Sequence, residues 1–167
     1  MIDQILDDII ATEGGLVDHP ADKGGITNWG ITLPTLTDYL GRPADANDIR
    51  TLTAQDAKDI YRALYIERPG FGAITDGNLL SLVVDMAVNH GVTRAIKLLQ
   101  RALILDDDGI FGPKTKSALL GSDPHPIYLR LIAERIRFYG RLITKDPSQS
   151  VFAAGWLNRA SRFVERA

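Results

Sequence analysis

Residues 13–32 read EGGLVDHPADKGGITNWGIT, from Glu13 to Thr32, and interrupt a chain that is otherwise rich in helical periodicity. From Gly14 onward, the stretch holds five glycines, one proline and two aspartates, and it has no amphipathic period. About twenty irregular residues inside a compact domain usually serve a function. We therefore expect a functional loop here, with room for a short β-hairpin.

A hydrophobic period of about 3.6 residues dominates the rest of the chain, and no strand-like alternation extends beyond a few residues. One apolar face precedes the loop and ends at Gly14; it consists of Ile2, Ile5, Leu6, Ile9 and Ile10. Further helices are expected from Thr53 to the Pro69-Gly70 pair and over 78–89, 93–104, 113–120, 126–143 and 151–164. Residues 78–89 are apolar on nearly every side, so that helix should run through the core. The sequence predicts a mainly α protein.

Glu13 is the most informative residue of the first helix. Steps of three and four residues from Ile10 and Ile9 place it on the buried face, at the C-terminal end. Burial and the negative end of the helix dipole both disfavour an ionised carboxylate. The general acid of a glycosidase must hold its proton near neutral pH, and this position suits that role. The alternative is that Glu13 only binds backbone amides of the loop.

Two aspartates, Asp18 and Asp22, follow Glu13 in the glycine-rich loop. Glycosidases pair their acid with a second carboxylate across the scissile bond, and glycines allow the backbone to bring such a group back over the helix end. Aspartates in loops also commonly form Asx turns, so either residue could be purely structural.

Polar and aromatic residues outside the loop add candidates for substrate binding. Asp85 and Asn89 lie four residues apart on the apolar helix 78–89, where buried polar groups must find partners. Both could line a sugar groove, although Asp85 is somewhat better suited to a network that ties helices together. The candidate sugar platforms are Trp29, Tyr61 and Tyr65, although aromatic residues on an amphipathic stripe more often belong to the core.

Several classes of site are disfavoured. The chain has no cysteine, which removes disulfides and thiolate metal sites. Its histidines, His19, His90 and His125, lack the spacing of a zinc amidase. The run Asp106 to Gly109 lacks the closing glutamate of a calcium loop, and no P-loop or G-x-S-x-G motif is present. We expect no metal and no cofactor.

The net charge of −2 hides an asymmetry, because residues 126–167 carry +5 and the remainder −7. A basic region can attract an anionic polymer or a membrane surface, and the alternative is a solvated helix face. Nucleic acid is disfavoured because no aromatic-plus-basic reading motif accompanies the charge.

The stretch from Glu13 to Thr32 closely resembles the opening of glycoside hydrolase family 108, whose pattern EGG-x-V-D-x-P-x-D-x-GG-x-T-N-x-GIT it matches at the fixed positions. Members are N-acetylmuramidases, found as phage endolysins and as lysozyme-like secretion helpers. The second half is similar to the predicted peptidoglycan-binding domain that accompanies the family, in the segments 85–91, 108–113, 137–139 and 155–159. The resemblance implies a lysozyme-like fold, with a catalytic half (1–70) and a helical half (71–167) packed as one body.

By this resemblance, Glu13 is the catalytic residue. Phage-type lysozymes arrange Glu, eight residues, Asp, five residues, Thr, and here eight residues separate Glu13 from Asp22 and four separate Asp22 from Thr27. The weaker similarity favours Asp22 as the base and Thr27 as the residue that holds water. Asp18 is the alternative base, because it is also a fixed position of the family pattern.

The activity implied is hydrolysis of the β-1,4 bond between N-acetylmuramic acid and N-acetylglucosamine by a monomeric phage endolysin. A chitinase, a lytic transglycosylase and a non-catalytic wall-binding or secretion-accessory protein are the alternatives. The sequence shows neither a signal peptide nor an apolar run of membrane-spanning length. We therefore expect synthesis in the bacterial cytoplasm and release to the wall by a holin-like or other route, with the basic region 126–167 touching the envelope.

Overall fold

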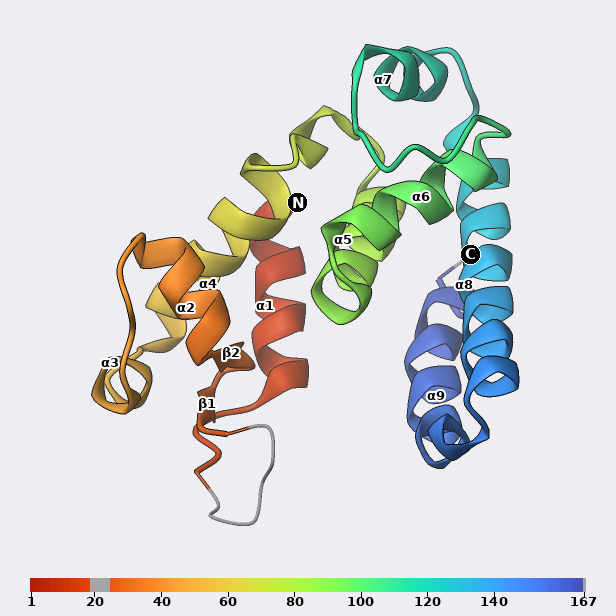
Figure 1. The fold of residues 1–167 in the computed structure, drawn as a ribbon. Helices are drawn as coiled ribbons and strands as arrows, with labels where there is room; N and C mark the ends of the chain where they lie inside the picture. Colours follow the sequence, from red (N-terminus) through yellow and green to blue (C-terminus); the bar gives the residue numbers. More distant parts are fainter. Residues whose placement is uncertain (19–24, 167) are drawn as a thin grey trace. The chain divides into compact units, whose positions relative to one another are not determined.

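The computed structural model describes residues 1–18 and 25–166, and it divides the chain into two compact units, Met1–Pro69 and Gly70–Ala167 (Figure 1). Over the described residues it contains nine α-helices, three short 3-10 or π helices and one two-stranded sheet. The prediction of a mainly α protein is confirmed.

The core of the first unit forms where α1 (Ile2–Glu13) packs against α4 (Ala54–Arg62). The buried face of α1 is the predicted stripe of Ile5, Leu6, Ile9 and Ile10. Helix α4 begins after Thr53, where a helix was expected to start, and Thr53 and Asp56 form a reciprocal capping box that satisfies two free amides at the helix start. Periodicity and capping together fix this helix pair.

The glycine-rich loop contains the short hairpin, formed by β1 (Thr27–Asn28) and β2 (Ile31–Thr32) with Thr27 opposite Thr32 and Asn28 opposite Ile31. Its two turn residues, Trp29 and Gly30, have φ of 53° and 75°, as a type I′ turn requires. A further antiparallel bridge joins Val17 to Thr27. Figure 1 shows the hairpin at the C-terminal end of α1.

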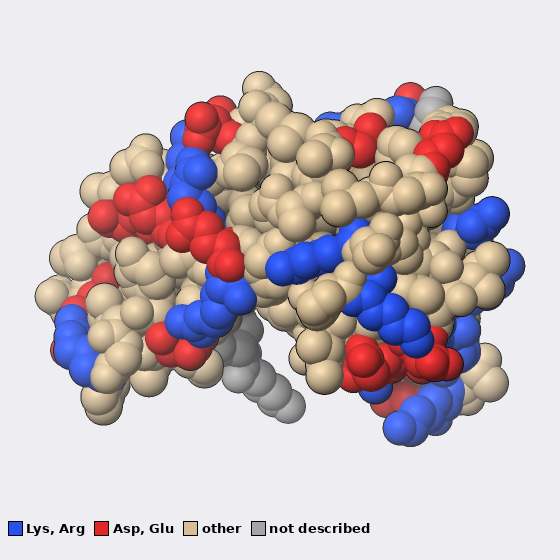
Figure 2. All heavy atoms as spheres, turned by 90° about the horizontal axis from the view of Figure 1, so that it is seen from above, with Lys and Arg blue, Asp and Glu red and all other residues tan. Residues whose placement is uncertain are grey.

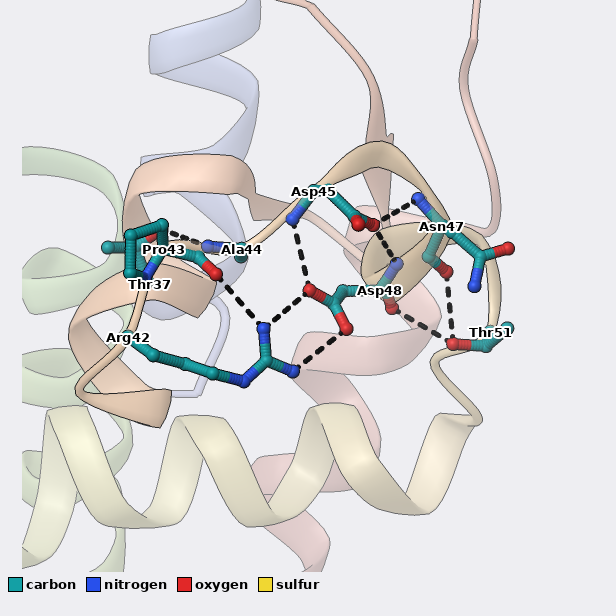
Figure 3. Close-up of polar contacts among 8 residues, drawn as sticks. All are labelled: Thr37, Arg42, Pro43, Ala44, Asp45, Asn47, Asp48 and Thr51. Carbon is teal, nitrogen blue, oxygen red and sulfur yellow. Dashed lines mark hydrogen bonds and ion pairs between the residues drawn. The ribbon is translucent and has the colours of Figure 1, made fainter.

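Two short helices that the sequence patterns did not indicate, α2 (Leu33–Leu40) and α3 (Ala46–Arg50), pack against β2 and β1 respectively. A polar corner holds their connection (Figure 3). Arg42 reaches both carboxylate oxygens of Asp48 at 2.9 and 3.0 Å, and Asp45 caps α3 in a second capping box with Asp48. The guanidinium of Arg42 lowers the pKa of Asp48 to about 2, so this carboxylate stays ionised over the working pH range.

Helix α4 continues into a π-helical turn, η1 (Ala63–Glu67), in which the Arg68 amide donates to the Ala63 carbonyl five residues earlier at 2.9 Å. A π turn inserts one residue into the helical ladder and rotates the side chains that follow it. Such turns often occur at functional sites.

The second unit is built around α5 (Gly77–His90), which packs against α6 (Val92–Ala102) and α8 (Pro124–Lys145); α8 also packs against α9 (Ala153–Val164). Seven side chains of α5 are buried, which confirms it as the central helix. The remaining elements are η2 (Phe71–Ala73), α7 (Pro113–Leu120) and η3 (Pro147–Phe152). The last predicted helix, 151–164, is shorter than expected because η3 occupies its first two residues.

Surface charges on the face drawn in Figure 2 are mixed, with Lys and Arg side chains beside Asp and Glu side chains. In the basic region 126–167, Arg135 and Arg159 pair with Asp85, and Arg137 and Arg141 pair with Glu134. Asp85 lies outside residues 126–167, so its pairs offset one of the five excess positive charges, whereas Glu134 is already counted in the +5. None of the described helices combines the length and the apolar character needed to cross a bilayer.

Candidate active site

Glu13 is the last residue of α1, and its side chain is half-buried. The helix ends directly after it, at Gly14, which has a φ of 75° and whose amide donates to the Ile10 carbonyl at 3.3 Å. The sequence placed Glu13 on the buried face of its helix. The structure leaves it partly accessible because the chain turns away at Gly14, so the carboxyl can meet solvent or a substrate.

Gly30 brings the hairpin turn into close contact with Glu13. A Cβ atom at this position would lie 2.6 Å from the Tyr61 hydroxyl, 2.8 Å from Glu13 Cβ and 3.0 Å from Glu13 Cγ. Only a residue without a side chain fits against these two groups. The Tyr61 hydroxyl also donates to the Trp29 carbonyl at 3.0 Å, so it supports the turn from the same side. Glu13, Gly30 and Tyr61 thus form one packed cluster.

Tyr65 belongs to the same neighbourhood and lies on the π turn η1. Its ring centroid is 5.6 Å from that of Tyr61. Burial raises the pKa of Tyr65 above its ordinary value, a hydrogen bond with Thr35 opposes the rise, and the negative charges of Asp38 and Glu13 add to it. Tyr65 therefore remains a neutral phenol near neutral pH, within the electrostatic reach of Glu13.

The hairpin is anchored on its other side by Asn28. This side chain is 4% exposed, and its amide donates to the carbonyls of Ile49 and Leu52 at 3.1 Å each. A buried amide with both protons used is a strong fixed point. The polar corner of Figure 3 holds α3, so it indirectly holds the hairpin as well.

The aromatic candidates differ in their accessibility. Trp29 and Tyr65 are partly exposed, which suits a sugar platform. Tyr61 is 2% exposed, which leaves little of its ring for a sugar. Its contacts with Gly30 and Trp29 point to support of the turn instead.

Of the two candidate bases, the structure describes only Asp18; Asp22 lies outside the described residues. Asp18 accepts hydrogen bonds from Arg50 at 2.7 and 3.3 Å, and both side chains are roughly half exposed. This ion pair ties the loop to the end of α3. Thr27 uses its backbone amide and carbonyl to pair with Val17 at 2.9 and 2.8 Å, which closes the base of the loop.

Asp85 and Asn89 belong to the second unit. Asp85 accepts a hydrogen bond from Arg159 at 2.8 Å and forms an ion pair at 2.6 Å with Arg135, which is fully buried. Arg135 in turn donates to the Tyr139 hydroxyl at 2.7 Å. This is the helix-tying network that the sequence suggested for Asp85. Asn89 is exposed at the end of α5, and its amide donates to the Asp85 carbonyl at 2.6 Å.

Sequence reasoning did not single out three residues of this region: Gly30, Arg50 and Thr35. The Trp29-Gly30 pair carries a turn signal, but its contact with Glu13 is tertiary. Arg50 lies on α3, whose five residues are too few to show a period, and Thr35 lies on α2, which the sequence patterns did not indicate. Within residues 1–18 and 25–166, no group of three acidic or histidine side chains is arranged to hold a metal ion.

Comparison with known proteins agrees with this picture. The family model for glycosyl hydrolase 108 matches residues 6–91, and the model for a predicted peptidoglycan domain matches residues 94–161. The solved structure of Brucella abortus SagA is 33% identical, with a TM-score of 0.85 over 99% of this chain and 92% of that one. A search of curated proteins gave no match. The chain therefore belongs to glycosyl hydrolase family 108, a family of lysozyme-like muramidases, and carries a peptidoglycan domain of the predicted type.

Proposed function

We propose that this protein hydrolyses the β-1,4 bond between N-acetylmuramic acid and N-acetylglucosamine in bacterial peptidoglycan, with Glu13 as the proton donor. The observation that carries the proposal is the position of Glu13. It ends α1 as a half-buried carboxyl, packed against the hairpin turn and near two tyrosines.

In this reaction, the Glu13 carboxyl gives its proton to the glycosidic oxygen as the bond to the anomeric carbon of muramic acid breaks. Water adds to that carbon, and a second carboxylate accepts the proton that the water loses. The products are a free 4-hydroxyl on glucosamine and a reducing muramic acid. Neither step needs a cofactor.

We assign the second carboxylate to Asp22 in preference to Asp18. The Arg50 guanidinium engages Asp18 in an ion pair at 2.7 Å. This contact ties the loop to the end of α3, which gives Asp18 a structural role. The spacing from Glu13, which is similar to that of phage-type lysozymes, supports the same choice. Thr27 would hold the attacking water.

The two parts of the chain have different roles in this proposal. Residues 1–70 carry the catalytic groups, and residues 71–167 bind peptidoglycan. The sugar chain is contacted by Trp29, Tyr65 and Asn89. The protein acts after release from the cytoplasm, as an endolysin does. The match to a peptidoglycan domain over residues 94–161 supports a polymeric substrate.

The test is digestion of purified peptidoglycan with the wild-type chain and with Glu13→Gln, followed by mass spectrometry of the fragments. Glutamine has no proton to donate, so the rate should fall by about 10³-fold, within the usual range for general acid catalysis. Glu67→Gln is the matched control, because it removes an exposed carboxyl of the same unit and should act like wild type.

The fragment ends distinguish the alternatives. Reducing muramic acid identifies a muramidase, reducing glucosamine the opposite bond specificity, and 1,6-anhydromuramic acid a lytic transglycosylase. No fragments from the wild-type chain would mean a non-catalytic wall-binding protein. Wild-type rates from a folded Glu13→Gln variant would remove Glu13 from the mechanism.

A further inference from the structure

A concave site lies in the unit Gly70–Ala167, where α5 ends and α6 begins. It is an open cavity of about 400 Å³, lined by His90, Gly91, Val92, Thr93, Arg94 and Lys97. Its volume is in the range of small-molecule sites. Two cationic side chains and no acidic one line it.

Most other cations of this unit are already paired. Arg101 pairs with Asp107, Lys114 with Asp106, and Arg137 with Glu134. By contrast, no carboxylate among the described residues comes within ion-pair distance of Arg94 or Lys97. A hydrogen bond from Arg101 chiefly lowers the pKa of Asp107, and one from the Ile110 amide chiefly lowers that of Asp108. The charge of Lys97 adds a smaller part to both shifts, and Lys97 makes no direct pair with either carboxylate. The cavity therefore keeps a net positive charge.

The positive wall of the cavity is held in place by aromatic rings. The Arg94 guanidinium lies over the Phe138 ring at 5.2 Å from its centroid, a cation–π contact that restricts the long side chain. The His90 ring packs edge-on against Phe138 and Tyr139 at 5.1 and 5.4 Å. Burial lowers the pKa of His90 to about 4, so near neutral pH the charge of the cavity comes from Arg94 and Lys97.

Backbone groups add donors to these side chains. Gly91 caps α6 without a side-chain hydrogen bond, and the first amide to find an acceptor within the helix is that of Ala95. The amides of Val92, Thr93 and Arg94 therefore point out of the helix start without acceptors inside it. Together with the two cations, they can receive an anion.

We propose that this cavity binds a carboxylate of the peptidoglycan stem peptide, with Arg94 and Lys97 supplying the charge. The choice of ligand rests on the proposed function, and the model of the peptidoglycan domain includes both residues. Stem peptides carry free carboxylates at their acidic residues and at their C-terminus, while the glycan between them is largely neutral. The site would hold the peptide arm of the polymer rather than the sugar bond to be cut.

The test is an NMR titration of the ¹⁵N-labelled full chain with the synthetic peptide L-Ala–γ-D-Glu–L-Lys–D-Ala–D-Ala. This peptide has no glycosidic bond, so binding is measured independently of hydrolysis. We expect saturable shifts at the amides of Gly91 to Arg94. The double variant Arg94→Ala/Lys97→Ala should raise the Kd by about tenfold, as loss of a charge-assisted contact does. The double variant Arg101→Ala/Lys114→Ala removes the same charge from paired residues and should leave the Kd unchanged.

Three results would overturn the proposal. The first is equal binding of the same peptide with all its carboxyls amidated. The second is equal shifts from inorganic phosphate at the same concentration, which would mark a general anion site. The third is wild-type affinity of Arg94→Ala/Lys97→Ala with an otherwise unchanged spectrum. Failure of the Glu13→Gln experiment would refute the proposed activity but would leave peptide binding intact, so the two proposals fail separately.

Discussion

Replacement of Gly30 by alanine tests the contact that joins the hairpin to Glu13. The substitution has two separable costs. Alanine at a φ of 75° is strained by about 1–2 kcal/mol. Its methyl group would also lie 2.6 Å from the Tyr61 hydroxyl and 2.8 Å from Glu13 Cβ, and such overpacking costs about 1–3 kcal/mol. We expect the free energy of unfolding to fall by roughly 2–5 kcal/mol.

Gly25 provides a matched control, because it has the same φ of 75° and nothing within 4 Å of its would-be Cβ. Gly25→Ala should therefore show the backbone strain alone, about 1–2 kcal/mol. Urea titrations of both variants give the difference, which isolates the contact with Glu13 and Tyr61. Equal losses for the two variants would refute the claim that Gly30 is required by close packing.

A second substitution separates the two neighbours of Gly30. In the Tyr61→Phe background the nearest clashing atom is gone, so Gly30→Ala should cost less there than in the wild-type chain. The phenylalanine also loses the hydrogen bond to the Trp29 carbonyl, worth about 1 kcal/mol. Strictly additive losses in the free energy of unfolding of the double variant would contradict the assigned contact.

In the wild-type background, peptidoglycan hydrolysis by Gly30→Ala should fall by about 10²-fold, because a displacement of about 1 Å at a catalytic group has that effect.

Three further predictions concern other parts of the chain. Asp22→Asn should lower the rate of peptidoglycan hydrolysis by about 10³-fold and Asp18→Asn by only a few-fold, and the reverse order would make Asp18 the base. Burial lowers the pKa of His90 from 6.5 to about 4, so between these pH values the unfolded chain binds a proton that the folded chain does not. The free energy of unfolding therefore has its full value above pH 6.5 and falls by at most about 3 kcal/mol as the pH drops towards 4. His90→Phe should flatten this pH dependence, as measured by urea titrations. Arg162→Ala/Arg166→Ala should weaken binding to bacterial envelopes at low salt but leave cleavage of short soluble glycans unchanged, whereas wild-type binding across the salt range would reduce the basic region to a solvated surface.

Periodicity predicted the elements that are long and bury one face or all faces. Helix α1 matches its expected apolar stripe, and α5 is buried on most sides as expected, because helices of twelve and fourteen residues are long enough for the pattern to repeat. The Thr53 cap of α4 could also be predicted, because a capping box is a local pattern of two residues. These features depend only on near neighbours in the sequence.

The parts that could not be predicted depend on contacts between distant residues. Helix α3 has five residues and is held by Arg42 and Asp45 rather than by an apolar stripe. The π turn η1 follows α4 without any break in the sequence pattern. The tertiary contact of Gly30 with Glu13 joins residues seventeen apart that only the fold brings together. For the same reason, the sequence placed Glu13 on a buried face, whereas the helix end leaves it half-buried.

The turn beside Glu13 holds its backbone in an unfavourable conformation, as functional sites often do. Trp29 is a bulky residue at a positive φ, which costs about 1–2 kcal/mol relative to the ordinary helical region. Two sets of hydrogen bonds offset this cost. The Tyr61 hydroxyl donates to the Trp29 carbonyl, and the Asn28 side-chain amide donates to two carbonyls at and just after the end of α3. A strained turn that is held from both sides keeps its backbone in one position. That rigidity fixes the backbone that carries the partly exposed Trp29, and the next residue of the same turn, Gly30, packs against Glu13. A sugar stacked on Trp29 would then lie at a constant distance from the proton that its glycosidic bond requires.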